Sequence, residues 1–226
     1  MRAKAVSVGR VVIPEPQTFG NRVRPSFAKA IGILDANLKQ LPQAGNEIAL
    51  ILRGSQGETV GGDQVALPFA RGPRGAYWLS AKIVLEPFQN KYALKGVSLT
   101  VFRGEARSEK APLVRAEWDC PVSVVNTHAQ PHWHAYPGLI SPLADGERTT
   151  VGLFQPQQAV FELPEVEGVR SLPESRGFTK VHLAMASTWH LAKNPQDRVS
   201  MVDESEVFAW IENCIKYLKD QLTSQL

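Results

Sequence analysis

Three of the five histidines in this chain, His128, His132 and His134, fall within one short segment. A histidine side chain can exchange a proton near neutral pH, and a neutral imidazole is a common ligand of transition metals. The cluster therefore suits acid–base catalysis or the binding of a divalent metal. Zinc or manganese is the cofactor we expect, with His128, His132 and His134 as the metal ligands.

A strand would bring two of these histidines to one face. Pro131 to Tyr136 is predicted as a short strand, and successive side chains of a strand point to opposite faces of its sheet. His132 and His134 would then project together, with Trp133 on the other side. His128 lies in the preceding loop, from which it could reach the same ion.

A second polar group lies just upstream, in the predicted strand Leu113 to Asp119. Its apolar residues are expected to face the core, and they are Val114, Ala116 and Trp118. Its polar residues alternate with these and should share the other face; they are Arg115, Glu117 and Asp119. If the two strands pair as a hairpin around Cys120 to Gln130, this polar face adjoins His132 and His134.

These residue types suit the cleavage of a phosphodiester. A carboxylate orients an imidazole or holds a metal, a histidine moves a proton, and an arginine neutralises charge on phosphate oxygens. A hydrolytic zinc site would use the same groups. The structural alternative is a solvated sheet face with packing histidines. As an enzyme site, the expected catalytic set is Arg115, Glu117, Asp119, His132 and His134.

The segment from Val114 to Tyr136 resembles a known family. Arg115-Ala116-Glu117-Trp118-Asp119, followed by a loop and Pro131-His132-Trp133-His134, is similar to the Arg/Asp strand and Pro-His-x-His strand of TumE-type toxins. The resemblance covers a small part of the chain, and Cys120 to Gln130 is an insert relative to that pattern. It implies a nuclease-like role in a toxin–antitoxin or defence locus.

The surrounding elements predict an α+β fold, an antiparallel, meander-like sheet with an N-terminal and a C-terminal helix packed on it. Apolar spacing predicts a first helix from Ser26 to Leu41, preceded by Pro25 and ended by Pro42. Gly54 to Gly62 is predicted as a loop. Further strands are expected at Glu47 to Arg53, Val65 to Phe69, Ala76 to Leu85 and Ala93 to Phe102. Breaks are expected at Arg71-Gly72-Pro73 and at Glu86-Pro87.

The chain after the histidine cluster gives fewer signals. Pro137 to Gln158 is loop-rich, Ala159 to Leu163 is a candidate strand, and Thr179 to Met185 is either a strand or the start of a helix. The last helix is clearer, because Asp203 and Glu206 form a capping-box pattern. Its apolar stripe comprises Val207, Trp210, Ile211, Cys214, Leu218 and Leu222.

The remaining candidate groups favour structural interpretations. Cys120 and Cys214 are far apart and are interpreted as buried thiols. His182 lies in an apolar run, where it is either a core histidine or a side chain reaching the His132 and His134 site. His190 is interpreted as a surface residue.

The composition predicts one domain over residues 1–226, because 226 residues with 43% hydrophobic content can bury a sizeable core. No apolar run has the length of a signal peptide or a membrane span, so we expect a soluble, cytoplasmic protein without a membrane partner. Residues 1–46 hold seven Lys or Arg and two Asp or Glu, a net charge of +5. This basic segment is either a nucleic-acid contact or a solvated surface.

Two functions remain open on the sequence. The first is a nuclease-like phosphodiester hydrolase of a toxin–antitoxin or phage-defence system. The second is a non-catalytic binding or assembly subunit of a defence or nucleic-acid-handling complex, with the last helix meeting a protein partner. The second is favoured by the absence of a P-loop, a Rossmann glycine pattern, Gly-x-Ser-x-Gly and His-Glu-x-x-His.

Overall fold

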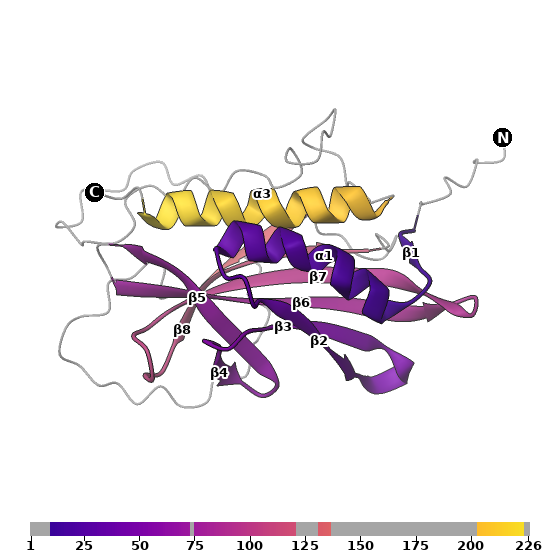
Figure 1. The fold of residues 1–226 in the computed structure, drawn as a ribbon, viewed down its shortest axis with the longest axis horizontal. Coiled ribbons are helices and arrows are strands. Elements are labelled where there is room, and N and C mark those ends of the chain that lie inside the picture. Colours follow the sequence, from indigo (N-terminus) through magenta and orange to yellow (C-terminus); the bar gives the residue numbers. More distant parts are fainter. Residues whose placement is uncertain (1–9, 73–74, 121–130, 137–202, 224–226) are drawn as a thin grey trace, which may run out of the picture.

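A computed structural model describes residues 10–72, 75–120, 131–136 and 203–223. The described residues form an α+β fold in which two helices cover one face of an antiparallel sheet (Figure 1). The predicted fold class is therefore confirmed. The helices are α1 (Pro16–Ile31) and α3 (Glu204–Thr223). The strands are β1 (Val12–Ile13), β2 (Asn37–Pro42), β3 (Ile48–Arg53), β4 (Glu58–Gly61), β5 (Gln64–Gly72), β6 (Gly75–Phe88), β7 (Lys91–Arg103), β8 (Ala111–Asp119) and β9 (His132–Ala135).

The main path of the sheet follows the order β2-β3-β6-β7-β8-β9, with every pair antiparallel. β5 pairs with β6 beside β3, β4 pairs with β5, and the short β1 pairs with the start of β7. β6, β7, β8 and β9 are consecutive along the chain within the described residues, so this half of the sheet is a meander. This meander places β8, which carries Arg115, beside β9, which carries His132 and His134.

The first helix begins and ends earlier than the prediction of Ser26 to Leu41. α1 starts at Pro16 and stops at Gly32, which adopts a left-handed backbone with φ of 85°. Glycine takes this conformation without steric cost, so it commonly ends helices. Pro25 lies inside the helix rather than before it. Burial of Phe19, Val23, Phe27 and Ile31 on one stripe offsets the helix bond that a proline removes.

The end of the predicted helix is a separate element. Asn37–Pro42 forms β2, an edge strand of the described sheet paired with β3. Leu38 and Leu41 therefore belong to a strand, and Leu34 lies in the connection, 93% exposed. Pro42 is tolerated at the end of an edge strand, where its missing N–H breaks few ladder bonds.

The other strands predicted within the described residues are present, with different limits. β4 occupies part of the predicted loop Gly54 to Gly62. The predicted break at Glu86-Pro87 is wrong, since both residues lie within β6, which runs to Phe88. The turn follows at Gln89 and Asn90, whose positive φ values of 47° and 59° reverse the chain into β7. The features predicted within residues 137–202, including His182 and His190, lie outside the described residues.

The core lies between the sheet and the two helices. Asp203 caps α3 by accepting a hydrogen bond from the backbone N–H of Glu206 at 3.0 Å, as the capping pattern predicts. The buried stripe of α3 contains Val207, Trp210, Ile211, Cys214, Ile215, Leu218 and Leu222. Arg22 of α1 forms a two-point ion pair with Glu204, and Lys29 pairs with Glu212, so the two helices are also joined by charge.

Two tryptophans fix which face of β8 and β9 meets this core. Trp118 of β8 is fully buried and packs edge-on against Trp210 of α3, with ring centroids 5.6 Å apart. Trp133 of β9 lies 6.1 Å from the ring of Tyr217, also on α3. Because alternate residues of a strand point to opposite faces, the neighbours of these tryptophans face away from the helices.

Candidate metal centre

The pairing of β8 with β9 assembles the site. Glu117 lies directly opposite His132, and Arg115 lies directly opposite His134. Directly opposed residues of an antiparallel pair share a face, and their side chains touch. The four residues therefore form a square on the side of the sheet that the helices leave uncovered. The expectation that the two strands pair around residues 120–130 is confirmed.

The carboxylate of Glu117 is the centre of this group. One of its oxygens, Oε2, lies 2.8 Å from Nε2 of His134 and 3.5 Å from Nε2 of His132. The other oxygen, Oε1, lies 3.1 Å from Nε of Arg115. The two histidine Nε2 atoms are 2.8 Å apart, and their rings meet at 73°. The side chains are about one-fifth to one-third exposed, so the group is shielded but open to a small molecule.

The surroundings of Glu117 determine its charge. Burial alone would raise the pKa of this carboxyl, because a charged group loses hydration in a partly buried position. Hydrogen bonds from His132 and His134 and the positive charge of Arg115 outweigh that effect and lower the pKa to about 2. Glu117 is therefore a carboxylate at neutral pH, with its charge facing both imidazoles.

This arrangement can hold a metal ion. Glu117, His132 and His134 each offer one ligand atom, and the three atoms lie within 4.8 Å of one another. Two imidazole nitrogens and one carboxylate oxygen form a donor set that zinc and other divalent transition metals accept. Three protein ligands leave further coordination positions open, which is the pattern of catalytic rather than structural metal sites.

The ligand set differs from the predicted one in a single member. His132 and His134 were expected as ligands, and the third ligand within the described residues is Glu117. His128, the expected third ligand, lies outside the described residues. The polar alternation of β8 predicts Glu117 as a catalytic residue that orients an imidazole or coordinates a metal, although the predicted metal ligands are the three histidines alone.

Arg115 and Asp119 occupy the same face as Glu117 at different distances from the group. Arg115 contacts Glu117 and lies opposite His134, as a phosphate-binding arginine would need to. Asp119 lies at the end of β8, opposite Gly96, and is not part of the ligand group. It faces Lys95, whose pKa is raised mainly by its ion pair with Glu47 and also by Asp119.

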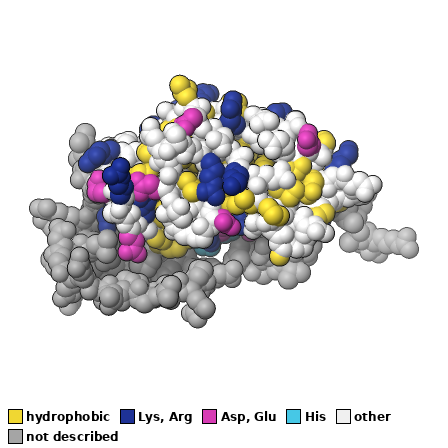
Figure 2. Space-filling model, turned by 60° about the horizontal axis from the view of Figure 1, so that its bottom comes forward, with side chains coloured by type: hydrophobic (Ala, Val, Ile, Leu, Met, Phe, Trp, Pro, Cys, Tyr) yellow, Lys and Arg dark blue, Asp and Glu magenta, His cyan; other side chains and the backbone are white. Residues whose placement is uncertain are grey.

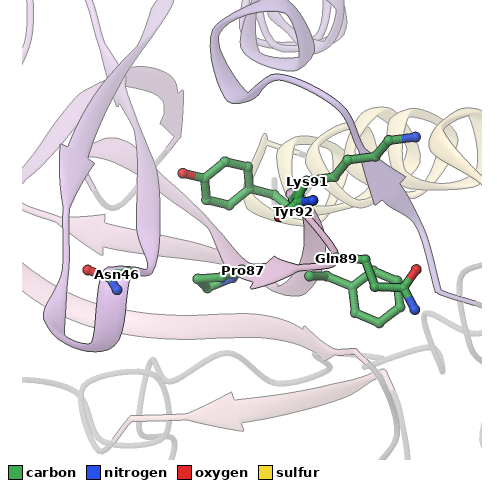
Figure 3. A pocket seen from close by; sticks show the side chains of 7 residues that line it. Asn46, Pro87, Gln89, Lys91 and Tyr92 are labelled. Carbon is green, nitrogen blue, oxygen red and sulfur yellow. The ribbon is translucent and has the colours of Figure 1, made fainter.

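A separate hollow with a volume of about 420 Å³ lies elsewhere on the molecule (Figure 3). It is lined by Asn46 and by residues 87–92 of the β6–β7 turn. None of the histidines or carboxylates of the candidate metal centre lines it. The hollow is therefore separate from the candidate metal centre on β8 and β9.

No family model, curated protein or solved structure matches this chain. The resemblance of Val114 to Tyr136 to TumE-type toxins stays a prediction. A function for this protein has to be argued from its own side chains.

Several cations of the basic N-terminal segment have partners within the protein. Arg10 pairs with Glu86 at 2.8 Å, and Arg22 and Lys29 pair with α3. Arg2 and Lys4 lie outside the described residues, and the nucleic-acid role of the segment stays a prediction. Among the described residues, neither helix is long and apolar enough to span a membrane.

Proposed function

We propose that this protein is a metal-dependent, nuclease-like phosphodiester hydrolase, acting in a toxin–antitoxin or phage-defence system. The observation that carries the proposal is the convergence of His132, His134 and Glu117 on one small volume, with Arg115 beside it. Zinc and manganese are the ions proposed for this donor set. A metal bound there would supply an activated water and polarise a phosphoryl oxygen.

The side chains have distinct roles in this proposal. His132 and His134 would hold the ion through their imidazole nitrogens, and Glu117 would supply the third ligand and one negative charge. Arg115 donates hydrogen bonds to the non-bridging oxygens of the phosphodiester and neutralises the charge that grows there as the bond to the leaving oxygen breaks. Its planar fork suits two phosphate oxygens at once.

The positions of Arg115 and of the two histidines around Glu117 support these separate roles. Arg115 approaches Oε1 of Glu117, whereas both histidines approach Oε2. The guanidinium therefore lies beside the ligand atoms without entering the group of three. A phosphate placed between Arg115 and the ion would meet positive charge on both sides.

The first test is metal content. Protein purified with zinc or manganese supplied should contain about one ion per chain by elemental analysis, and the double variant His132→Ala/His134→Ala should contain almost none. Asp119→Asn is the matched comparison, because Asp119 shares the face but lies outside the ligand group. A double variant that retains its metal would refute the site.

The second test is cleavage. RNA and DNA oligonucleotides should be cut by the metal-loaded protein, and cleavage should stop with a chelator and in the double histidine variant. Arg115→Lys should bind metal normally and cleave at least about 10-fold more slowly, because a point charge replaces a two-point contact. Unchanged cleavage in the double variant would rule out this site as its source, and no cleavage by the metal-loaded parent protein would favour the binding or assembly subunit.

A further inference from the structure

Two rows of side chains run from the candidate metal centre across the sheet, and all their members are polar except Ile51, which is buried. Each row follows the ladder of directly opposed residues through neighbouring strands. The longer row crosses from β9 to β2, and it consists of His132, Glu117, Ser98, Lys82, Ile51 and Lys39. The shorter row crosses from β9 to β6, and it consists of His134, Arg115, Thr100 and Ser80.

Both rows lie on the face that α1 and α3 leave uncovered. Residues alternating with them, such as Ala116, Leu99 and Ile83, belong to the main core under the helices. Figure 2 turns this underside toward the viewer. Basic side chains are spread over it, and a small area of histidine surface is visible near its lower edge. The longer row therefore places the half-buried Ser98 and the cations Lys82 and Lys39 on the same face as the candidate metal centre, whereas Ser80 and Thr100 of the shorter row are buried.

The two lysines of the longer row differ from three of the cations near the N-terminus. Arg10, Arg22 and Lys29 form ion pairs within the protein. Lys39 and Lys82 form no ion pair with any described residue. Lys39 is exposed, and Nζ of Lys82 lies 3.4 Å from the side-chain oxygen of Gln43, a neutral group. Their positive charge is therefore available to an external anion.

The spacing of these cations fits an extended chain of phosphates. Neighbouring strands lie about 4.8 Å apart, so Lys82 is about 10 Å from Glu117 along the row, and Lys39 is about 10 Å further on. Arg115, in the adjoining row, lies opposite His134, where it would contact a phosphate held at the centre. Positive groups thus recur at intervals of two strands, from the candidate metal centre to the β2 edge of the described sheet.

We propose that this face binds single-stranded nucleic acid, with its backbone lying across the strands and with Lys82 and Lys39 contacting phosphates on one side of the scissile bond. The inference rests on the proposed hydrolase function and names its substrate class. Ser98, which is half-buried in the longer row between Glu117 and Lys82, supplies a hydroxyl donor. Chain polarity and the choice between RNA and DNA are decided by the experiment below.

The twist of the sheet favours a single strand over a duplex. Adjacent strands are rotated by about 20–25°, so the side chains of a row turn through roughly 100° over five steps. A flexible single strand can wind along such a row. A double helix has a persistence length of about 50 nm and cannot follow this turn without a large bending cost.

The test separates binding from cleavage. Full-length protein in chelator is titrated against fluorescent 12-nucleotide RNA, DNA and a DNA duplex, and affinity is measured by anisotropy at several salt concentrations. The logarithm of affinity falls with the logarithm of salt by about 0.7 per phosphate contact on a single strand. The double variant Lys39→Gln/Lys82→Gln should lower that slope by about 1.4 and weaken binding at least 10-fold.

The matched control is Lys216→Gln, because Lys216 is exposed on α3, on the other side of the sheet. It should bind as the parent protein does. The double lysine variant should also cleave a small diester, bis(p-nitrophenyl) phosphate, at the parent rate, since that substrate does not reach the lysines. A rise in KM for oligonucleotides with unchanged small-diester cleavage is the expected signature.

The possible failures are distinguishable. Parent-like oligonucleotide binding in the double lysine variant, or tighter binding of the duplex, overturns the proposed row. Single-strand binding that depends on the lysines, without cleavage of any diester, overturns the hydrolase and leaves the binding face. Equal losses in Lys39→Gln/Lys82→Gln and Lys216→Gln would show that only net charge matters, which also overturns the row.

Discussion

At the scale of single residues, Glu117 is the group on which the site depends. It contacts both histidines through one oxygen and Arg115 through the other. A carboxylate shared in this way keeps two imidazoles pointing at one place and balances their charge when they are protonated. A metal ion that took the place of those protons would be held by the same carboxylate, because metal binding requires deprotonated ligands.

The depressed pKa of Glu117 predicts an acid-labile contribution to stability. Its pKa is about 2 in the folded protein against 4.5 for the ordinary group, so the contribution is complete above pH 4.5 and is lost as pH falls toward 2. Its full size is about 3 kcal/mol, of which about 2 kcal/mol is lost by pH 3. Urea unfolding of metal-free protein at pH 6 and pH 3 measures this loss.

Glu117→Gln provides the comparison for that measurement. Asp35, Glu58 and Asp203 also have lowered pKa values, from hydrogen bonds to Ser55, Lys110 and Ser205 respectively. These groups are identical in the variant, so the difference between the two proteins isolates Glu117. A variant that loses as much stability as the parent between pH 6 and pH 3 would contradict the assignment.

At the scale of elements, α3 determines which face of β8 and β9 reaches solvent. Trp118 and Trp133 pack toward α3, and this orientation turns Glu117, His132 and His134 to the other side. The helix therefore positions the candidate metal centre without contacting it. Its own anchor is Trp210, which is fully buried among the core residues.

Trp210→Ala should lower the free energy of unfolding by about 3–5 kcal/mol, because it leaves a large cavity beside Trp118. Trp210→Phe should cost markedly less. An aromatic ring remains against Trp118, and the indole N–H, which is buried without a hydrogen-bond partner among the described residues, is removed. Chemical denaturation of both variants measures the difference. Equal losses in both would contradict a cavity as the cause.

At the scale of the whole molecule, the two faces of the sheet have different roles. One face carries the apolar core under α1 and α3, and the other carries the polar rows that end in the candidate metal centre. β8 and β9 are paired by hydrogen bonds, and each strand carries core residues on one face and residues of the candidate metal centre on the other. A ligand bound to the histidines therefore also stabilises the folded sheet. Metal binding should therefore be visible in global unfolding.

Metal at about 100 times its Kd should stabilise the folded chain by about 2.7 kcal/mol, provided that the unfolded chain does not bind it. For a protein of this size each kcal/mol raises Tm by about 2–4 °C, so the expected shift is about 5–10 °C. Calorimetry with zinc or manganese measures it. His132→Ala should abolish the shift, and a shift of equal size in that variant would place the ion elsewhere.

The errors in the predicted fold have a common physical cause. Phe27, Ile31, Leu34, Leu38 and Leu41 are spaced as a helix stripe requires, whereas in β2 Leu38 and Leu41, three residues apart, lie on opposite faces of a strand. Gly32 decides between them, because its left-handed backbone ends α1. Likewise, a proline predicts a break at Pro87, but β6 pairs with β3 only as far as Leu85, so Pro87 lies where β6 is paired with β7 and no longer with β3.

The sequence by itself determined the α+β class, the capped last helix, and the polar faces of the two strands that carry Arg115, Glu117, His132 and His134. Alternation has a period of two, so it assigns a side chain to a face without choosing its partner on the next strand. Only the hydrogen-bonded register decided that Glu117, and not Asp119, meets the histidines. The same ladder, continued through β7 and β6, aligned Ser98 and Lys82 with them, across segments that local sequence does not relate.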